Sequence, residues 1–247
     1  MRLPPQPVGI LGGMGPAAGA DLLRLFVQAC TEQLRSEGRP VHDQSYPPHW
    51  LAQLPVADRS AALADANAPQ PLQELREGLA SLAALGARTV AIACNTAHAW
   101  HGRLQEGCPS VRVLHVMDEV AAHLAMRGFA SAGLLATEGT YGSGLYQEAL
   151  ARRGMACVTP QEEERKTLMR AIYSGVKAGR LAEAALLFEE VAHALAARHS
   201  PPVLILGCTE IPLAFSQARA PGGMVLVDPA QVLARRLAAW AYGGAEA

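Results

Sequence analysis

Two cysteines hold matching places in the sequence and are the side chains best placed to do chemistry. Cys94 follows the apolar run VAIA and precedes NT, and Cys208 follows LILG and precedes TE. Small polar residues are common helix N-caps, so each thiol is expected between the end of a strand and the start of a helix. Backbone N–H groups and the helix dipole favour the thiolate there, the form that acts as a base or a nucleophile. One such cysteine is equally compatible with a small buried apolar side chain, whereas a matched pair favours chemistry.

The three remaining cysteines, Cys30, Cys108 and Cys157, lack this setting and are expected to be structural. The total of five is odd and no Cys-x-x-Cys pair occurs. Both facts argue against a disulfide framework and against a zinc site built on paired thiolates.

Other candidate binding residues lie near the expected strand ends. The GGMG turn at 12–15, which contains Gly13 and Met14, could hold a carboxylate or a phosphate, or be a tight turn only. It matches neither the dinucleotide fingerprint nor a phosphate-binding P-loop. Arg59 and Lys166 could each pair with a substrate carboxylate, although a lone cation of this kind is commonly a solvated surface charge.

Two histidines follow the first cysteine at helical spacing. His98 lies four residues after Cys94, and His101 comes one turn later. Cys94 and His98 could form a nucleophile–base pair, or His101 could join a metal site. Because no comparable histidine follows Cys208, we expect both on a helix face, with His98 near the site and no bound metal.

Short apolar runs alternate with helical patterns along the whole chain. This alternation implies parallel sheets flanked by helices, with ligands bound beyond the carboxyl ends of the strands. An internal repeat relates VGILG at 8–12 to AGLLA at 132–136, and VAIACNT to LILGCTE, so we predict two similar α/β halves. Strands are expected at 8–11, 41–46, 89–93, 111–114, 132–136, 203–206 and 224–227, and helices at 17–35, 72–85, 118–127, 144–153, 163–178, 181–198 and 229–242.

Composition excludes several classes of protein. Half of the 247 residues are hydrophobic and 17% are charged, which predicts a packed core rather than extended disorder. The formal net charge of -1 offers no basic excess for binding nucleic acid. No long apolar run predicts a membrane span, and the first residues lack a signal-peptide core. We therefore expect a cytoplasmic protein with neither a nucleic-acid nor a membrane partner.

The motifs of the chain resemble those of the aspartate/glutamate racemase family, specifically its aspartate racemase-like branch. The pieces are short, but together they extend from residue 8 to about 228, nearly the whole chain. They are GILGGMGP at 9–16, DQ at 43–44, DRS at 58–60, CNTAH at 94–98, LATEGT at 135–140, AIYSGVKAG at 171–179 and LGCTEIP at 206–212.

The resemblance implies two three-layer α/β domains related by a pseudo-two-fold axis, with the active site in the cleft between them. Residues 1–115 and 224–247 would form the first domain, which carries Cys94. Residues 116–223 would form the second, which carries Cys208. The resemblance also implies a homodimer.

The activity that the resemblance implies is racemisation of an acidic amino acid, aspartate first and glutamate next, without pyridoxal phosphate, metal or nucleotide. Cys94 and Cys208 would be bases on opposite faces of this small-molecule substrate. General chemistry agrees, because an α-proton is very weakly acidic and racemisation removes it from one face and returns a proton to the other.

The resemblance further implies a set of substrate-binding residues. Small polar residues would surround the α-carboxylate, Arg59 would hold the side-chain carboxylate, and Lys166 falls near the second cation of the family. The implied set is Gly13, Met14, Arg59, Asn95, Thr96, Thr137, Lys166, Thr209 and Glu210.

One segment departs from the family pattern and leaves the substrate open. Residues 52–55 are AQLP where the family has Asn-Asn-Pro or Ser-Asn-Pro, Ala57 replaces a proline, and HWL at 49–51 is bulkier than expected. Two alternatives therefore stand beside racemisation of an acidic amino acid. One is a related cysteine-dependent isomerase or racemase of another small carboxylate, and the other is a non-catalytic protein that binds an acidic amino acid.

Overall fold

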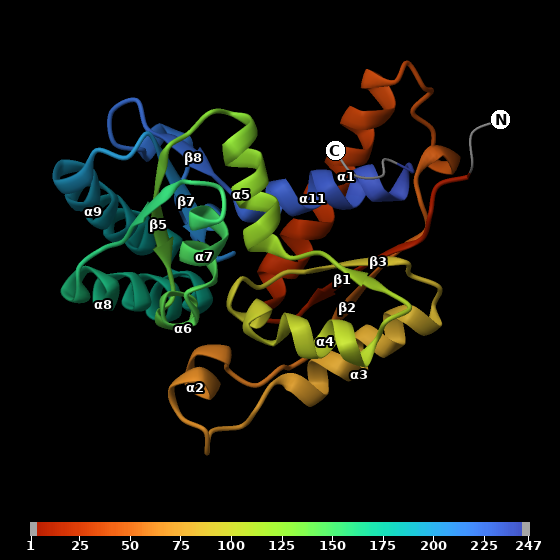
Figure 1. The fold of residues 1–247 in the computed structure, drawn as a ribbon, viewed down its shortest axis with the longest axis horizontal. Helices are drawn as coiled ribbons and strands as arrows, with labels where there is room; N and C mark the ends of the chain where they lie inside the picture. Colours follow the sequence, from red (N-terminus) through yellow and green to blue (C-terminus); the bar gives the residue numbers. More distant parts are fainter. Residues whose placement is uncertain (1–3, 244–247) are drawn as a thin grey trace.

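The chain forms two parallel four-stranded sheets, one from each half of the sequence (Figure 1). The computed structural model describes residues 4–243. The first sheet has the order β2-β1-β3-β4 and the second the equivalent order β6-β5-β7-β8. The strands are β1 (Val8–Gly12), β2 (His49–Gln53), β3 (Thr89–Ile92), β4 (Arg112–Val113), β5 (Ser131–Ala136), β6 (Ala156–Val158), β7 (Val203–Gly207) and β8 (Val225–Val227).

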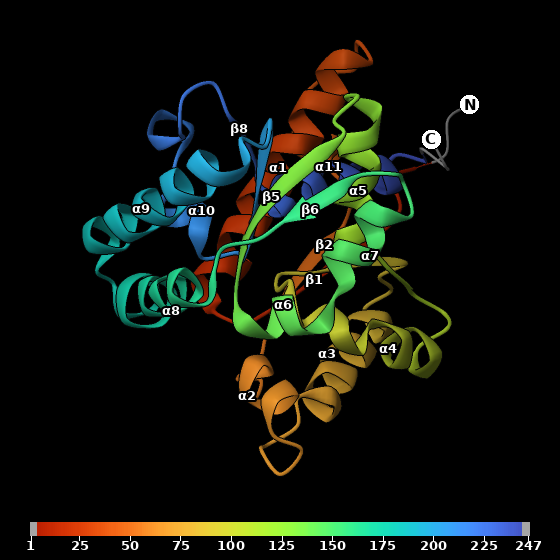
Figure 2. The same ribbon diagram turned by 60° about the vertical axis from the view of Figure 1, so that its left-hand side comes forward.

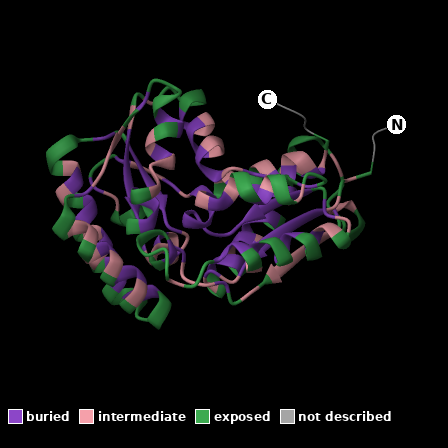
Figure 3. Ribbon diagram, turned by 60° about the horizontal axis from the view of Figure 1, so that its bottom comes forward, coloured by how far each residue is buried: buried purple, intermediate pink, exposed green. Residues whose placement is uncertain are grey.

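The central strands are apolar because both of their faces are covered. Every residue of β1, β3 and β7 is buried, and Figure 3 shows this burial along the strands of both halves. Continuous apolar runs are typical of parallel sheets packed on both faces. The two-part α/β architecture predicted from the repeat is confirmed.

The helices lie around the two sheets (Figures 1 and 2). Ile10 of β1 packs in one apolar cluster with α1, and its neighbour Leu11 packs in another with α3, as alternation along a strand requires. The helices are α1 (Pro16–Ser36), α2 (Arg59–Ala64), α3 (Leu72–Ala84), α4 (His101–Gly107), α5 (Val116–Met126), α6 (Glu138–Ser143), α7 (Leu145–Ala151), α8 (Glu162–Arg170), α9 (Leu181–His199), α10 (Ile211–Ala214) and α11 (Pro229–Ala241).

Five short turns complete the secondary structure: η1 (Asp43–Ser45), η2 (Thr96–Trp100), η3 (Ala171–Gly175), η4 (Val176–Ala178) and η5 (Gln217–Arg219). Of these, η3 is a π-turn and the others are 3₁₀ turns. None of the described helices is long and apolar enough to cross a membrane.

The two halves share one apolar core on the side of α1, α5 and α11. The last helix, α11, packs against α1 and α5 although α1 lies near the other end of the chain (Figure 1). One cluster includes Phe26 of α1, Leu124 of α5, Leu237 of α11 and Leu134 of β5, all without exposed surface. This core fixes the carboxyl ends of the two sheets relative to each other.

The structure differs from the sequence prediction in the second strand and in one helix, and it contains one strand, β6, and four short helices, α2, α4, α6 and α10, that were not predicted. The expected strand at 41–46 is wrong: it contains η1, and the second strand is β2, which pairs with β1 from Val8↔His49 to Gly12↔Gln53. The reason is local, since Asp and Ser favour turns, and β2 is a half-buried edge strand with an apolar run of only three residues, WLA at 50–52. The expected helix at 163–178 is interrupted at Ala171, where η3 and η4 follow α8.

The expected domain boundaries agree with the position of α11 but not with that of β8. α11 returns to the first half by packing on α1, but β8 pairs with β7 in the second sheet, so a boundary at 224 separates β8 from its own sheet. Residues 1–3 and 244–247 of the expected first domain lie outside the described residues. The division into domains stays a prediction.

Substitution of Gly13, in the turn after β1, tests how closely this turn packs against the segment after β2. Gly13 has φ +96, and a Cβ there would lie 2.0 Å from the Leu54 carbonyl oxygen. We expect Gly13→Ala to lower the free energy of unfolding by at least about 2 kcal/mol, because left-handed strain and overpacking add. Gly38→Ala, at φ +64 with nothing within 4 Å, should cost about 1 kcal/mol. Urea denaturation followed by tryptophan fluorescence measures both, and equal midpoints for the two variants would contradict the close approach.

Candidate active site

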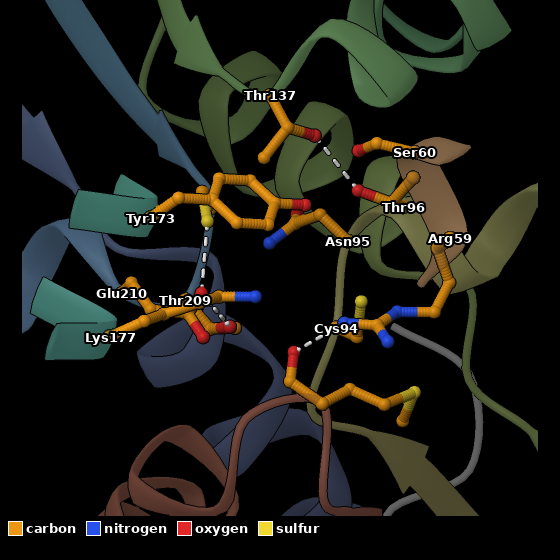
Figure 4. A pocket seen from close by; sticks show the side chains of 12 residues that line it. Arg59, Ser60, Cys94, Asn95, Thr96, Thr137, Tyr173, Lys177, Thr209 and Glu210 are labelled. Carbon is orange, nitrogen blue, oxygen red and sulfur yellow. Dashed lines mark hydrogen bonds between the residues drawn. The ribbon is translucent and has the colours of Figure 1, made fainter. Parts of the chain in front are cut away.

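Both cysteines line one cavity between the two halves of the chain (Figure 4). Each lies just beyond a strand, Cys94 after β3 and Cys208 after β7, and the two are 6% and 7% exposed. The cavity is lined by Met14, Arg59, Ser60, Cys94, Asn95 and Thr96 from the first half and by Thr137, Tyr173, Lys177, Cys208, Thr209 and Glu210 from the second.

Arg59 lies beside Cys94 with most of its donors already bound (Figure 4). Its Nη1 donates to the carbonyls of Val56 and Ala57 at 3.1 and 2.9 Å, and its Nη2 donates to Met14 O at 2.8 Å. A guanidinium has five N–H groups, so the Nε–H and one Nη2–H stay available for an anion. Burial opposes its charge, but the Cys94 and Asp58 side chains raise the pKa of Arg59 on balance.

Cys208 has the opposite partner, a carboxylate. Its Sγ donates to Glu210 Oε2 at 3.0 Å, and Glu210 Oε1 accepts from the Gly15 N–H at 3.0 Å. Burial and the Glu210 carboxylate raise the pKa of the Cys208 thiol well above its ordinary value. The second thiol is therefore held protonated, by a residue that also reaches across to the first half.

Polar side chains of both halves meet on the remaining wall. Thr96 Oγ1 lies 3.0 Å from the hydroxyls of both Thr137 and Thr140, and Tyr146 donates to Asn95 Oδ1 at 2.6 Å. Figure 4 shows the Asn95 amide nitrogen pointing into the cavity. The wall thus presents hydroxyl and amide donors, which suit a carboxylate.

Two residues that the sequence analysis did not select, Tyr173 and Lys177, also line the cavity. The Tyr173 hydroxyl donates to Asp58 Oδ2 at 2.8 Å, and the Lys177 ammonium lies 4.5 Å from the centre of the Tyr173 ring. Burial opposes the charge of Asp58, yet the Ala61 N–H and this hydroxyl hold its pKa below the usual value. Both residues belong to the AIYSGVKAG motif, whose match to the family was the signal that could have identified them.

The prediction for Lys166 is wrong. Its ammonium lies on the exposed face of α8, 2.7 Å from Glu163 and 3.3 Å from Glu162, and its side chain is 60% exposed. The resemblance located the second cation only approximately along this stretch, and η3, which begins after Arg170, changes the helical phase of the residues that follow, Lys177 among them. Lys177, not Lys166, is the second cation at the cavity.

The turn after β1 contributes to the cavity lining, whereas the segment that departs from the family pattern, residues 49–55, does not. Met14 lines it, whereas Gly13 is absent from the lining and packs against Leu54. Residues 49–55 do not line it either, and the Gln53 amide donates to Pro16 O at 2.9 Å. The altered AQLP segment therefore lies outside the lining of the cavity.

The His98 ring lies beneath the Cys94 loop and bonds main-chain carbonyls, not the thiol. Its Nδ1 is 2.9 Å from Cys94 O and its Nε2 is 3.2 Å from Leu114 O. Burial and the neighbouring His115 and His101 lower the pKa of His98 to about 3. A Cys94–His98 nucleophile–base pair is therefore not formed, and no group of histidines, cysteines or carboxylates within residues 4–243 could hold a metal ion.

Residues 11–237 match the Asp/Glu/Hydantoin racemase family. The chain belongs to this family. Its members are isomerases that work without pyridoxal phosphate, so the cavity is the candidate active site of an amino-acid racemase.

Individual relatives agree with the family assignment. The structure is similar to Picrophilus torridus aspartate racemase, with a TM-score of 0.78 and 27% identity over 94% of this chain and 92% of that one. It shares its fold with an aspartate racemase homologue from Pyrococcus horikoshii OT3, with a TM-score of 0.70 and 24% identity over 94% and 97% of the two chains. In sequence, it is 26% identical over 154 residues to the broad specificity amino-acid racemase RacX of Bacillus subtilis (strain 168), a match spanning 61% of this chain and 63% of that protein.

The contrasting partners of the two thiols predict different reactivity at equal exposure. At neutral pH we expect iodoacetamide to alkylate Cys94 faster than Cys208, because burial and the Glu210 carboxylate oppose ionisation of the Cys208 thiol, whereas within residues 4–243 no carboxylate of the first half lines the cavity next to Cys94. Glu210→Gln should move the reactivity of Cys208 to lower pH and raise its alkylation rate at fixed pH by about 10-fold, equivalent to one unit of pKa. Peptide mass spectrometry measures each cysteine separately. Glu163→Gln, at a carboxylate whose side chain is 82% exposed, is the control, and an unchanged Cys208 profile in Glu210→Gln would refute the assignment.

Proposed function

We propose that this chain racemises an acidic amino acid, aspartate first and glutamate next, without a cofactor and with Cys94 and Cys208 as its two bases. One observation supports the proposal above the others: the two thiols come from matching strand ends in opposite halves and line the same cavity. A binding protein needs no such matched pair, so the non-catalytic alternative is disfavoured.

The two thiols start the reaction in different protonation states. We assign the first step to Cys94, beside the Arg59 guanidinium: acting as a thiolate, it removes the α-proton, so that the Cα–H bond breaks and an S–H bond forms. Cys208, held as a thiol by Glu210, delivers its proton to the opposite face, so its S–H bond breaks as the new Cα–H bond forms. One turnover exchanges the two states, and the next returns them.

Binding of a dicarboxylate is supported by the donors around the cavity. Asn95, Thr96, Thr137 and Thr209 supply neutral donors for the α-carboxylate. The Arg59 guanidinium, whose Nε–H has no hydrogen-bond partner among the described residues, and the Lys177 ammonium supply two cations. Donors and cations that stabilise the developing charge at the α-carbon and its carboxylate lower the barrier to proton removal.

Two further points extend the proposal beyond the geometry. The Picrophilus torridus relative is an aspartate racemase, which favours aspartate, whereas the Bacillus subtilis relative has broad specificity, which favours a wider range of amino acids. A panel of L- and D-amino acids analysed by chiral chromatography decides between them. The family resemblance also leads us to propose a homodimer, which light scattering measures.

The two-base proposal predicts how each cysteine affects turnover. In deuterium oxide, the unmodified protein should incorporate deuterium at the α-carbon during racemisation of aspartate. Cys94→Ala and Cys208→Ala should each reduce racemisation by at least about 10³-fold, because each removes a proton donor or acceptor. Chiral chromatography with mass spectrometry measures both quantities. Cys157→Ala, outside the cavity lining, should keep full activity, and full turnover in either cavity variant would exclude the mechanism.

Lys177 lines the cavity and Lys166 does not, so substitution of each gives a paired test of substrate binding. Lys177→Met should raise the KM for aspartate by about 10- to 100-fold, because it removes a charge-assisted hydrogen bond to a carboxylate. Lys166→Met removes the same side chain from the exposed face of α8 and should leave KM unchanged. Steady-state kinetics separates the two variants, and equal effects would contradict the placement of Lys177 at the substrate.

A further inference from the structure

Asn95 lies in the turn after β3, and its side chain is held by a residue from the other half of the chain. Tyr146, in α7, donates its hydroxyl to Asn95 Oδ1 at 2.6 Å. Tyr146 has no exposed surface, and Asn95 is 3% exposed. A hydrogen bond in such a dry place is costly to lose, because neither group has water as a substitute partner.

The direction of this hydrogen bond follows from what else the Tyr146 hydroxyl contacts. Among residues 4–243 it has no second hydrogen-bond partner, and burial raises the pKa of Tyr146, so it stays protonated. If Asn95 turned its amide nitrogen toward the hydroxyl, the O–H proton would be buried without an acceptor. The amide oxygen therefore faces Tyr146, and the nitrogen is directed away from it.

His98 holds the main chain of the same turn. His98 Nδ1 lies 2.9 Å from Cys94 O and 3.2 Å from Asn95 O, and the His98 N–H donates to Asn95 O at 3.0 Å. With the backbone held, the freedom left to Asn95 is the rotation of its side chain. That rotation is what Tyr146 restricts.

We propose that Tyr146 is a positioning residue that sets the Asn95 amide with its nitrogen toward the cavity, where it donates to a carboxylate of the substrate. Figure 4 shows the nitrogen in this orientation. A flipped amide would present a carbonyl oxygen to the carboxylate, so the hydroxyl of Tyr146 decides whether the site attracts or repels the ligand. The inference rests on the proposed function for the identity of that ligand.

The test measures binding of succinate, a dicarboxylate with no α-amino group to racemise, by calorimetry. We expect Tyr146→Phe to raise the Kd for succinate, and the KM for aspartate, by about 3- to 10-fold, with kcat within about two-fold. Asn95→Ala should raise Kd at least as much, and Tyr146→Phe should add nothing in the Asn95→Ala background, because the hydroxyl acts only through the amide.

Tyr141→Phe is the matched control. Tyr141 is also a buried tyrosine of the second half, but its hydroxyl bonds the main chain, at Leu134 O and the Ala136 N–H. Its loss should lower the urea midpoint without changing Kd or KM, which separates a structural role from a positioning role. If Tyr146→Phe does not fold, Asn95→Asp serves instead: it keeps an acceptor for Tyr146, replaces the donor by an anion, and should weaken succinate binding by at least about 100-fold.

The outcomes distinguish this inference from the proposed function. Succinate binding with the expected shifts, in a protein that racemises no amino acid, would support the role of Tyr146 and overturn the proposed function. Racemisation with unchanged Kd and KM in Tyr146→Phe would overturn the role of Tyr146 alone. Failure of the unmodified protein to bind succinate would also overturn it, because the turn would then offer no donor to a carboxylate.

Discussion

A buried carboxylate at the boundary of the two halves is the feature on which the cavity depends. Glu210 is 4% exposed, and a carboxylate removed from water is stable only when its oxygens accept enough hydrogen bonds. Here the donors are the Gly15 N–H, the Cys208 thiol and the Thr209 hydroxyl. Because Gly15 and Cys208 belong to different halves, the charge is fully satisfied only while the halves are apposed. The group that completes the cavity thus also fixes the proton on one of its thiols.

The equivalent strand orders place two cysteines symmetrically, but racemisation by two bases requires them to differ. Identical surroundings would leave both thiols in the same protonation state, and one proton donor and one acceptor are needed at once. The difference comes from residues that the two halves do not share, since Glu210 stands where the repeat has Thr96 in the first half. Arg59, held by three carbonyls of the first half, lies beside Cys94, and Glu210 lies beside Cys208. In the proposed mechanism, the repeated architecture supplies the positions of the two thiols, and the neighbouring charges decide which thiol gives a proton and which accepts one.

The positions of the two cysteines could be predicted from the sequence because apolar runs, caps and the internal repeat are local signals. The structure does bring Cys94, Cys208 and Arg59 to one cavity. Lys177 could not be placed in this way, because the π-turn η3 changes the helical phase and nothing in the helical periodicity marks it. Contacts such as Tyr173 with Asp58, 115 residues apart, leave no periodic trace in the sequence at all. The second strand was missed because β2 is a half-buried edge strand whose apolar run is only three residues long.

The contacts between the halves differ in kind on the two sides of the molecule. Around the cavity they are hydrogen bonds: Glu210 to Gly15, Tyr173 to Asp58, Tyr146 to Asn95 and the Thr96 group. A neutral hydrogen bond contributes about 1 kcal/mol net and one to a carboxylate about 1.5 to 3 kcal/mol, because water can replace the lost partner once the groups separate. On the α1, α5 and α11 side the halves share a continuous apolar core, whose exposure costs about 25 cal/mol per Å². The hydrogen bonds of Glu210, Asn95 and Asp58 all cross between the halves, so the same set of contacts positions the polar groups of the cavity and the carboxylate that keeps the Cys208 thiol protonated.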